Sequence, residues 1–186
     1  MISNPLVDKK ALIIIDMINQ FDFQHGEELY RHTVPAAKKI YELKTRAKEV
    51  SIPVIYVNDN FKNWQGDFQD LVNACLNESK LGRDIVELIK PEEGDYHILK
   101  PSYSGFYATP LHILLEHLNV TSLIITGIAG NMCVQFTAND AFMLRYQLFV
   151  PSDCVASQTE RANIQALEQM KEILRANTCL SDTINL

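Results

Sequence analysis

Long apolar segments are missing from this sequence. No stretch approaches the roughly 18 apolar residues that a membrane-spanning helix requires. The start of the chain lacks the shape of a secretory signal peptide, because the apolar run over residues 11–15 is short and is followed by Asp16. The formal net charge is −6 and the pI is about 5.3, with no basic face for phosphate. We therefore expect a cytoplasmic protein that binds neither membranes nor nucleic acid.

Paired thiols and paired histidines are also missing. The cysteines include no C-x-x-C pair, which argues against a zinc knuckle or a disulfide framework and favours free thiols. They are Cys75, Cys133, Cys154 and Cys179. The five histidines form no H-E-x-x-H pair, and Asp59, after an apolar run, has no histidine within reach in the sequence. We expect neither a metal site nor a cofactor.

Apolar runs that alternate with helical patterns predict an α/β fold with a parallel sheet. The length of 186 residues fits one domain over residues 1–186, and no linker or internal repeat divides it. Residues 11–15 form a continuous apolar run, as expected for a strand that is buried on both faces. Further strands are predicted at 53–57, 96–99, 122–128, 147–150 and 178–180.

Helices are predicted between these strands. One begins at Thr33 with Pro35 in its first turn, and another begins at Thr109-Pro110. A third follows the turn that contains Cys133. The Ser157-x-x-Glu160 pattern predicts a capping box for a last helix that ends near residue 174. The less regular segment 58–94, with short helical stretches near 68–76 and 84–89, is interpreted as an insertion over one end of the sheet.

Four polar features lie just past the ends of predicted strands: Asp16, Asp59, Lys100 and the turn 129–133. Sites in open parallel sheets form beyond the carboxyl ends of strands, so we expect these features at one rim. A carboxylate directly after five apolar residues is costly unless it is paired or functional, and a structural cap explains Asp16 equally well. A lysine at a sheet end ordinarily reaches to water, but beside Asp16 it becomes a plausible buried partner.

Cys133 lies at a strand-to-helix turn, in Gly127-Ile-Ala-Gly-Asn-Met-Cys133. A lone cysteine is usually a small buried hydrophobe. The amides and dipole of a helix N-terminus, however, stabilise a thiolate and an oxyanion, so we expect a thiol pKa below the usual value of about 8.5. The glycines at 127 and 130 lack the rest of a dinucleotide or Walker motif, which leaves a flavodoxin-like nucleotide-binding protein as a weaker alternative.

Side chains near these positions are candidates for substrate contact. Aromatic rings are expected to shape a small apolar pocket, with one asparagine as a polar contact, although Tyr103 and Phe106 could equally be packed inside. The candidates are Phe21, Asn60, Trp64, Tyr103 and Phe106. Ser102 and Ser104 are predicted to be hydrogen-bonding loop residues, because no G-x-S-x-G elbow surrounds them.

Three motifs together resemble those of the isochorismatase-like cysteine hydrolases, a superfamily that includes nicotinamidases and N-carbamoylsarcosine amidases. They are Ala-Leu-Ile-Ile-Ile-Asp16-Met with Phe21, Lys100-x-x-Tyr-Ser-Gly-Phe106, and Gly127-Ile-Ala-Gly-Asn-Met-Cys133-Val-x-x-Thr-Ala-x-Asp-Ala141. They stand in the family's order, and the resemblance covers nearly the whole chain. The resemblance implies a three-layer α/β/α, Rossmann-like fold with a six-stranded, mostly parallel sheet, and a homo-oligomer, either a dimer or a tetramer.

By matching position, the resemblance implies that Cys133 is the nucleophile, Asp16 the base and Lys100 the third catalytic residue. It also implies a cis peptide bond before Ala129, with the amides of Ala129 and Cys133 forming the oxyanion hole. The family more commonly has threonine where this chain has Gly130, and we expect the glycine to loosen the turn. Nicotinamidases carry an Asp-x-His metal motif where this chain has Asp-Asn-Phe at 59–61.

The expected function is hydrolysis of a small amide, ureido or imide C–N bond through a thioester, without metal. Isochorismatases proper tend to lack the cysteine, so Cys133 favours acyl transfer over their vinyl-ether hydrolysis. Vinyl-ether hydrolysis and lactam hydrolysis are the alternatives among the enzymes. A non-catalytic binding protein on the same fold is the alternative outside the enzymes.

Overall fold

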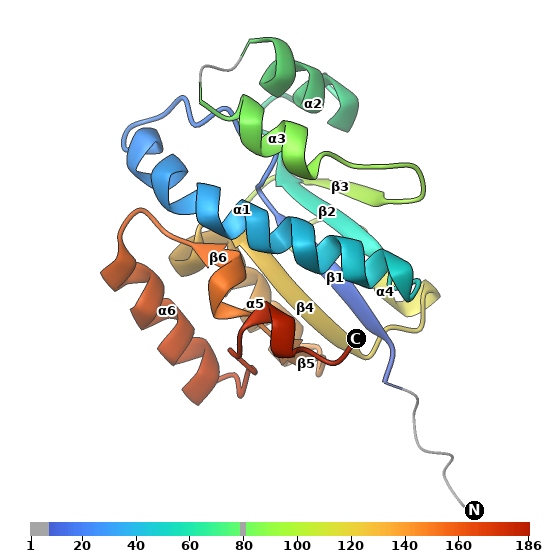
Figure 1. Ribbon diagram of the computed structural model, residues 1–186. Helices are drawn as coiled ribbons and strands as arrows, with labels where there is room; N and C mark the ends of the chain where they lie inside the picture. The colour runs from blue at the N-terminus through green and yellow to red at the C-terminus, as the bar shows by residue number, and fades with distance from the viewer. Residues whose placement is uncertain (1–7, 79–80) are drawn as a thin grey trace, which may run out of the picture.

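A parallel sheet of six strands forms the centre of the computed structural model, which describes residues 8–78 and 81–186. Residues 1–7, on which part of the signal-peptide prediction rests, lie outside the described residues. The strands are β1 (Lys10–Ile15), β2 (Val54–Asp59), β3 (Tyr96–Lys100), β4 (Ser122–Ile128), β5 (Gln147–Phe149) and β6 (Val155–Ala156). Their order is β3-β2-β1-β4-β5, and β6 pairs with the end of β4 beyond β5 (Figure 1).

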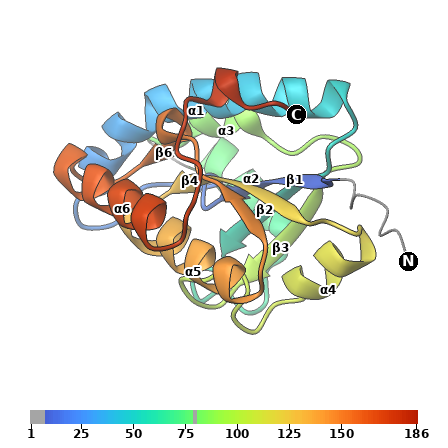
Figure 2. The ribbon, with the colours of Figure 1, turned by 90° about the horizontal axis from the view of Figure 1, so that it is seen from below.

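Helices cover both faces of the sheet. They are α1 (Gly26–Glu49), α2 (Phe68–Asn77), α3 (Arg83–Ile89), α4 (Leu111–His117), α5 (Gln135–Met143) and α6 (Glu160–Glu172). Figure 2 shows α1 and α3 on one side of the strands and α4, α5 and α6 on the other. This is the three-layer α/β/α arrangement that the sequence predicted.

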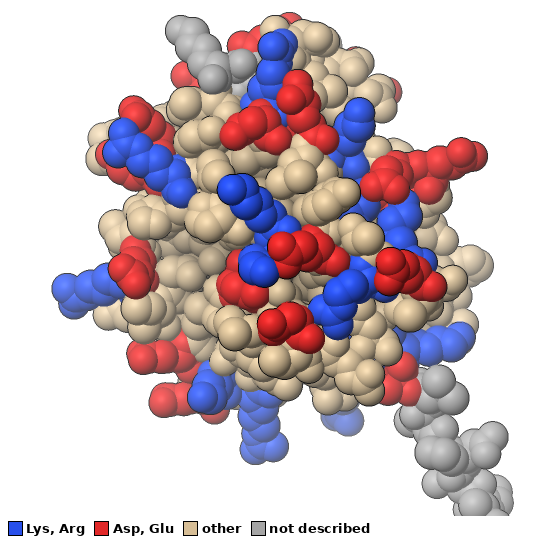
Figure 3. Space-filling view, viewed as in Figure 1, with Lys and Arg blue, Asp and Glu red and all other residues tan. Residues whose placement is uncertain are grey.

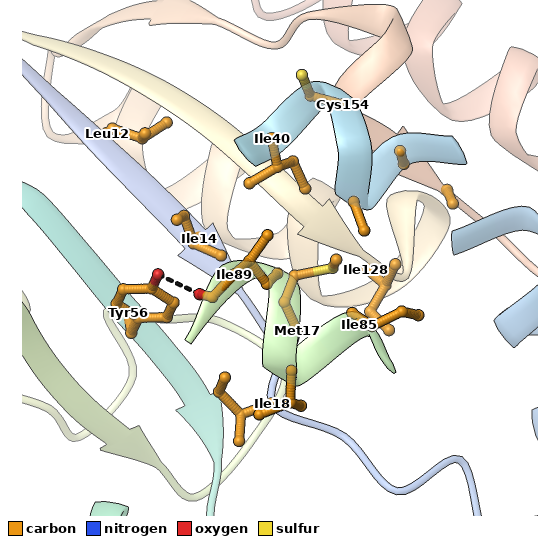
Figure 4. Packing of buried hydrophobic residues seen from close by; sticks show 14 of the residues in the cluster. Leu12, Ile14, Met17, Ile18, Ile40, Tyr56, Ile85, Ile89, Ile128 and Cys154 are labelled. Atoms are coloured by element: carbon orange, nitrogen blue, oxygen red, sulfur yellow. Dashed lines mark hydrogen bonds between the residues drawn. The ribbon is translucent and has the colours of Figure 1, made fainter. Parts of the chain in front are cut away.

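The side chains of β1 alternate between two cores, as the period of two in a strand requires. Leu12 and Ile14 pack under α1 and α3, in the cluster shown in Figure 4, whereas Ile13 and Ile15 pack under the helices of the opposite face. All four side chains are fully buried. Since each such residue contributes about 1.5–3 kcal/mol, β1 is anchored firmly and fixes the position of the residue that follows it.

The helix predicted from Thr33 begins seven residues earlier, at Gly26. Pro35 therefore lies inside α1 and not in its first turn. Proline cannot donate to the carbonyl of the residue four positions before it, here Arg31. Both residues are exposed, so water can satisfy that carbonyl, and the proline does not mark the helix start.

Three further predictions need correction. The sixth strand is residues 155–156 and not 178–180; Asn177, just before that stretch, forms an isolated bridge with Phe149. The N-cap of α6 is Thr159, whose Oγ1 accepts a hydrogen bond from the amide of Ala162, and not Ser157. The segment 58–94 is the crossover from β2 to β3, and its helices pack in the same core as α1 instead of capping one end of the sheet.

Candidate active site

Three strand ends and one turn meet at a single rim of the sheet. Asp16 directly follows β1, and Asp59 and Lys100 are the last residues of β2 and β3, which the parallel register places opposite one another. Ile15 is paired with Val57 on one side and with Gly127 on the other. The turn that carries Cys133 begins just beyond that glycine, so the sheet register itself gathers the four features.

Lys100 is the centre of this cluster. Its Nζ lies 2.9 Å from Asp16 Oδ2 and 3.6 Å from Asp59 Oδ2. It also donates to the Sγ of Cys133 at 3.4 Å and to the carbonyl oxygen of Ser102 at 3.0 Å. Lys100 is 0% exposed, Asp16 5% and Cys133 9%, so the charged groups are nearly sealed from solvent.

The chain around Asp16 is held by two residues of β2. The amide of Asp59 donates to Asp16 Oδ1 at 2.6 Å. The buried side chain of Asn58 accepts a hydrogen bond from the amide of Ile18 at 3.1 Å and donates to its carbonyl at 2.9 Å. Asp16 itself takes the left-handed conformation, with φ 52°, which ends the strand. Sequence reasoning overlooked Asn58, although a buried amide directly after four apolar residues of the strand was a usable signal.

The electrostatics of the site keep a proton on the nucleophile at rest. Burial raises the pKa of Cys133 to about 12, and the Asp16 carboxylate adds to this, while Lys100 opposes it. Burial also raises the pKa of Asp16, against the effect of Lys100. Burial by itself would lower the pKa of Lys100, but Asp16, Cys133 and Asp59 raise it above its ordinary value. The expectation of a lowered thiol pKa is wrong, because desolvation outweighs the favourable groups.

Cys133 lies in one π-helical turn, Gly130–Val134, that leads into α5. The peptide bond between Ile128 and Ala129 is cis. The amides of Met132 and Val134 donate to the carbonyl of Ala129, at 2.9 and 3.2 Å. Backbone groups of the turn thus bond to one another, the amide of Cys133 lies in the turn, and Ala129 directly precedes it.

Gly130 is enclosed and not loose. A Cβ on this residue would lie 2.4 Å from Asn163 Oδ1 and 2.9 Å from Ser157 Oγ. Ser157 Oγ also accepts a hydrogen bond from the amide of Asn131 at 3.2 Å. Side chains from the start of α6 and the residues before it therefore fill the space beside the turn. The expectation that Gly130 loosens the turn is wrong, since any side chain there would collide with this packing.

A set of hydrogen bonds fastens the segment after Lys100 to the helix after Cys133. The buried Thr137 hydroxyl donates to the carbonyl of Cys133 at 2.7 Å and accepts from the amide of Gly105 at 2.9 Å. Ser104 Oγ donates to Asp140 Oδ2 at 2.5 Å and accepts from the amide of Phe106, which confirms its predicted role as a loop hydrogen-bonding residue. The sequence does not single out Thr137, because it cannot show which loop the hydroxyl contacts.

The predicted substrate contacts lie in different surroundings. Phe21 is 2% exposed and packs edge-on against Tyr30, so it belongs to the core. Phe106 is half-buried and stacks on Tyr146. The exposed ring of Tyr103 packs against Phe136, with ring centroids 5.3 Å apart, and this second ring was not predicted.

Asn60 and Trp64 line a hollow of about 240 Å³, and Asp16, Lys100 and Cys133 are not among its lining residues. Its other walls include Leu99 and Pro101, which flank Lys100 in the chain. The amide of Asn60 donates to the carbonyl of Lys100 at 3.1 Å, so the hollow adjoins the strand end that carries the lysine. Trp64, at 76% exposed, stands at its outer edge.

Within residues 8–78 and 81–186, no three His, Cys, Asp or Glu side chains are placed to hold a metal ion. The absence of a metal from the working site stays a prediction. No helix in this part of the chain is both long and apolar enough to cross a membrane.

Comparisons with known proteins point to one family. The isochorismatase domain family matches residues 10–182. The uncharacterized isochorismatase family protein YaaI of Bacillus subtilis (strain 168) is 44% identical over 175 residues, which cover 94% of this chain and 96% of that protein. The ureidoacrylate amidohydrolase RutB of Methylorubrum extorquens (strain ATCC 14718) is 39% identical over 190 residues, which cover 87% of this chain and 74% of that relative.

Solved structures agree on the fold. The N-carbamoylsarcosine amidase from Thermoplasma acidophilum superimposes with a TM-score of 0.73 at 24% identity, covering 96% of this chain and 99% of that one. An isochorismatase family protein from Desulfovibrio vulgaris gives a TM-score of 0.77 at 22% identity, covering 94% and 95%. With the motifs in place at one sheet rim and the family match over nearly the whole chain, this protein belongs to the isochorismatase-like hydrolase superfamily.

Proposed function

We propose that the protein is a cysteine hydrolase that cleaves a small amide, ureido or imide C–N bond through a thioester on Cys133. The observation that carries this proposal is the set of contacts around Lys100, which touches both the Asp16 carboxylate, at 2.9 Å, and the Cys133 sulfur, at 3.4 Å. A thiol, a carboxylate base and a cation that supports the thiolate are the groups that acyl transfer needs.

In the first half of the proposed reaction, Asp16 takes the proton of the Cys133 thiol as the sulfur attacks the substrate carbonyl. The raised pKa of Asp16 makes it a stronger base than an exposed aspartate, and Lys100 stabilises the sulfur anion as it forms. The amides of Ala129 and Cys133 donate to the oxyanion. Protonated Asp16 then gives its proton to the leaving nitrogen, the C–N bond breaks, and the acyl group remains on sulfur as a thioester.

In the second half, Asp16 accepts a proton from water while the water oxygen attacks the thioester carbonyl. The C–S bond breaks, the acid product leaves, and the proton returns from Asp16 to the sulfur. No group outside the three residues is required for proton balance. The resting thiol with a high pKa fits this scheme, because the proton moves only when substrate is present.

The relatives support the choice of bond. RutB is named for ureidoacrylate, and the structural neighbour is named for N-carbamoylsarcosine, and both names denote carbamoyl nitrogen compounds. A vinyl-ether hydrolase would have no use for a thiol at the centre of the site. A cytoplasmic location and a dimer or tetramer stay predictions, and light scattering on the purified protein tests the second.

The test is a panel of small amides, ureides and imides, with ammonia release and intact mass measured on each. We expect turnover of at least one compound and a transient mass increase that equals its acyl group. Cys133→Ala should lose both signals, while Cys179→Ala, which changes a thiol far along the chain, should keep both. Full turnover of any panel compound by Cys133→Ala would contradict the proposal.

A further inference from the structure

The three N–H donors of the Lys100 ammonium are already engaged by the protein. They face Asp16 Oδ2 at 2.9 Å, the carbonyl of Ser102 at 3.0 Å and the sulfur of Cys133 at 3.4 Å. Asp59 Oδ2 lies at 3.6 Å as a second counter-ion. Counted with a protonated thiol and with both carboxylates ionised, the two aspartates and the one ammonium carry one net negative charge.

The hollow beside the site adds no positive charge. Neither the hollow next to Trp64 nor the neighbouring one that shares Asn60, Asn63 and Leu99 is lined by any Lys, Arg or His among the described residues. The second hollow is lined instead by Asp67 and Asp70. Across the face seen in Figure 3, by contrast, Lys and Arg side chains stand among the Asp and Glu side chains.

The polar groups that the hollows do offer are neutral amides. Asn60 Oδ1 accepts from the amide of Lys62, and Asn63 Oδ1 accepts from the amides of Gln65 and Gly66. The side-chain oxygens are therefore engaged by the loop itself, and the N–H groups are the donors with which the two asparagines can bind a ligand. Neutral N–H donors suit a carbonyl oxygen, and they do not neutralise a carboxylate.

From these charges we infer that the active site takes uncharged substrates and disfavours carboxylate-bearing ones. This inference rests on the proposed function for the identity of the reacting atom, and goes beyond it in naming the substrate class: a neutral amide or ureide. Ureidoacrylate, for which RutB is named, carries a carboxylate, so the inferred preference differs from that relative's named substrate.

A pair of isosteric alkylating agents tests the inference without any knowledge of the natural substrate. Iodoacetamide is neutral and iodoacetate is an anion of nearly the same shape, and both alkylate a thiol. The rate at Cys133 is followed by peptide mass mapping, and the ratio of the two rates is divided by the same ratio for glutathione. We expect a preference of at least 10-fold for iodoacetamide in low salt, which shrinks as salt screens the charges.

Variants at the edge of the hollow give a matched control. Trp64→Lys adds a positive charge, while Trp64→Gln removes the same ring without adding one. We expect Trp64→Lys to raise the rate with iodoacetate several-fold over Trp64→Gln and to leave the rates with iodoacetamide equal. Lys62→Gln should not change the ratio, because this exposed lysine does not line either hollow.

A normalised ratio near one, or a preference for iodoacetate, would overturn the inference, even if amide turnover were found. Conversely, a strong preference for iodoacetamide in a protein that hydrolyses nothing would support the inferred charge preference and count against the proposed function. Where turnover is found, succinamate and its neutral isostere 4-oxopentanamide extend the same comparison to kcat/KM, with the neutral compound expected to be favoured at least 10-fold.

Discussion

Removing the hydroxyl of Thr137 should impair the site without touching a catalytic group. Thr137→Val keeps the size and shape of the side chain but loses two buried hydrogen bonds, one to the carbonyl of Cys133 and one from the amide of Gly105. These two bonds link the turn of the nucleophile to the segment after Lys100. Thr137→Ser keeps the hydroxyl and is the matched control.

The expected magnitude follows from the burial of the groups that lose their partner. An amide left without an acceptor in the interior costs about 1–3 kcal/mol, so we expect unfolding to require about 2 kcal/mol less. For a chain of this length that lowers Tm by roughly 4–8 °C. Because misplacement of reacting groups by about 1 Å can cost 100-fold, we expect kcat to fall about 10- to 100-fold while KM changes little.

The assay is a thermal melt by circular dichroism, followed by steady-state kinetics at 25 °C on a compound from the amide panel. The rate of alkylation of Cys133 by iodoacetamide should fall in Thr137→Val and recover in Thr137→Ser. Alkylation requires the thiolate, and the rate therefore measures how well Lys100 stabilises the sulfur anion. If Thr137→Val melted lower but kept its kcat and its alkylation rate, the residue would be merely structural and the reasoning would be refuted.

Other predictions concern charge, space and pH. Asp16→Asn should abolish turnover yet speed alkylation of Cys133, because the Asp16 charge raises the pKa of that thiol, and unchanged alkylation would contradict this. Gly130→Ala should destabilise the fold by about 1–3 kcal/mol in urea titrations, since its Cβ would lie 2.4 Å from Asn163 Oδ1. Burial raises the pKa of Cys75 to about 12, so the folded state holds a proton that the unfolded chain loses above about pH 9. Its stabilisation, complete below that pH, should decline by about 1.4 kcal/mol per pH unit from 9 to 12, and Cys75→Ala should unfold with a shallower alkaline dependence.

The sequence was most informative where burial imposes a long pattern. The run over residues 11–15 is buried on both faces, so every position had to be apolar, and the strand was predicted correctly. The two residues of β6 are too short to show any period, which is why the last strand was misplaced. The start of α1 was missed because a proline is typical of the first turn of a helix. Only the structure shows that Pro35 is exposed inside α1, where the helix tolerates it.

The sequence could predict those parts of the site that lie at the ends of strands. Asp16, Asp59 and Lys100 follow apolar runs. The parallel pairing of the strands places their backbone positions close together, independently of side-chain packing. The pKa of Cys133 was not predictable in the same way. A helix N-terminus can be read from sequence, but the desolvation that opposes it depends on how completely α5 and the sheet enclose the sulfur, and that is a property of the packed molecule.

Gly130 shows how a departure from a family pattern can be compensated in space. Where the family more commonly has threonine, this chain has no side chain, and the volume is occupied from outside by Asn163 and Ser157. Asn163 Nδ2 donates to the carbonyl of Val155 at 3.1 Å, and Ser157 Oγ accepts from the amide of Asn131 at 3.2 Å. The backbone of the turn therefore bonds to a residue 26 positions later in the chain, and the backbone of β6 bonds to a residue 8 positions later. From the sequence alone, this glycine is expected to weaken the turn. In the folded structure, its lack of a side chain lets residues at the start of α6 pack against the turn.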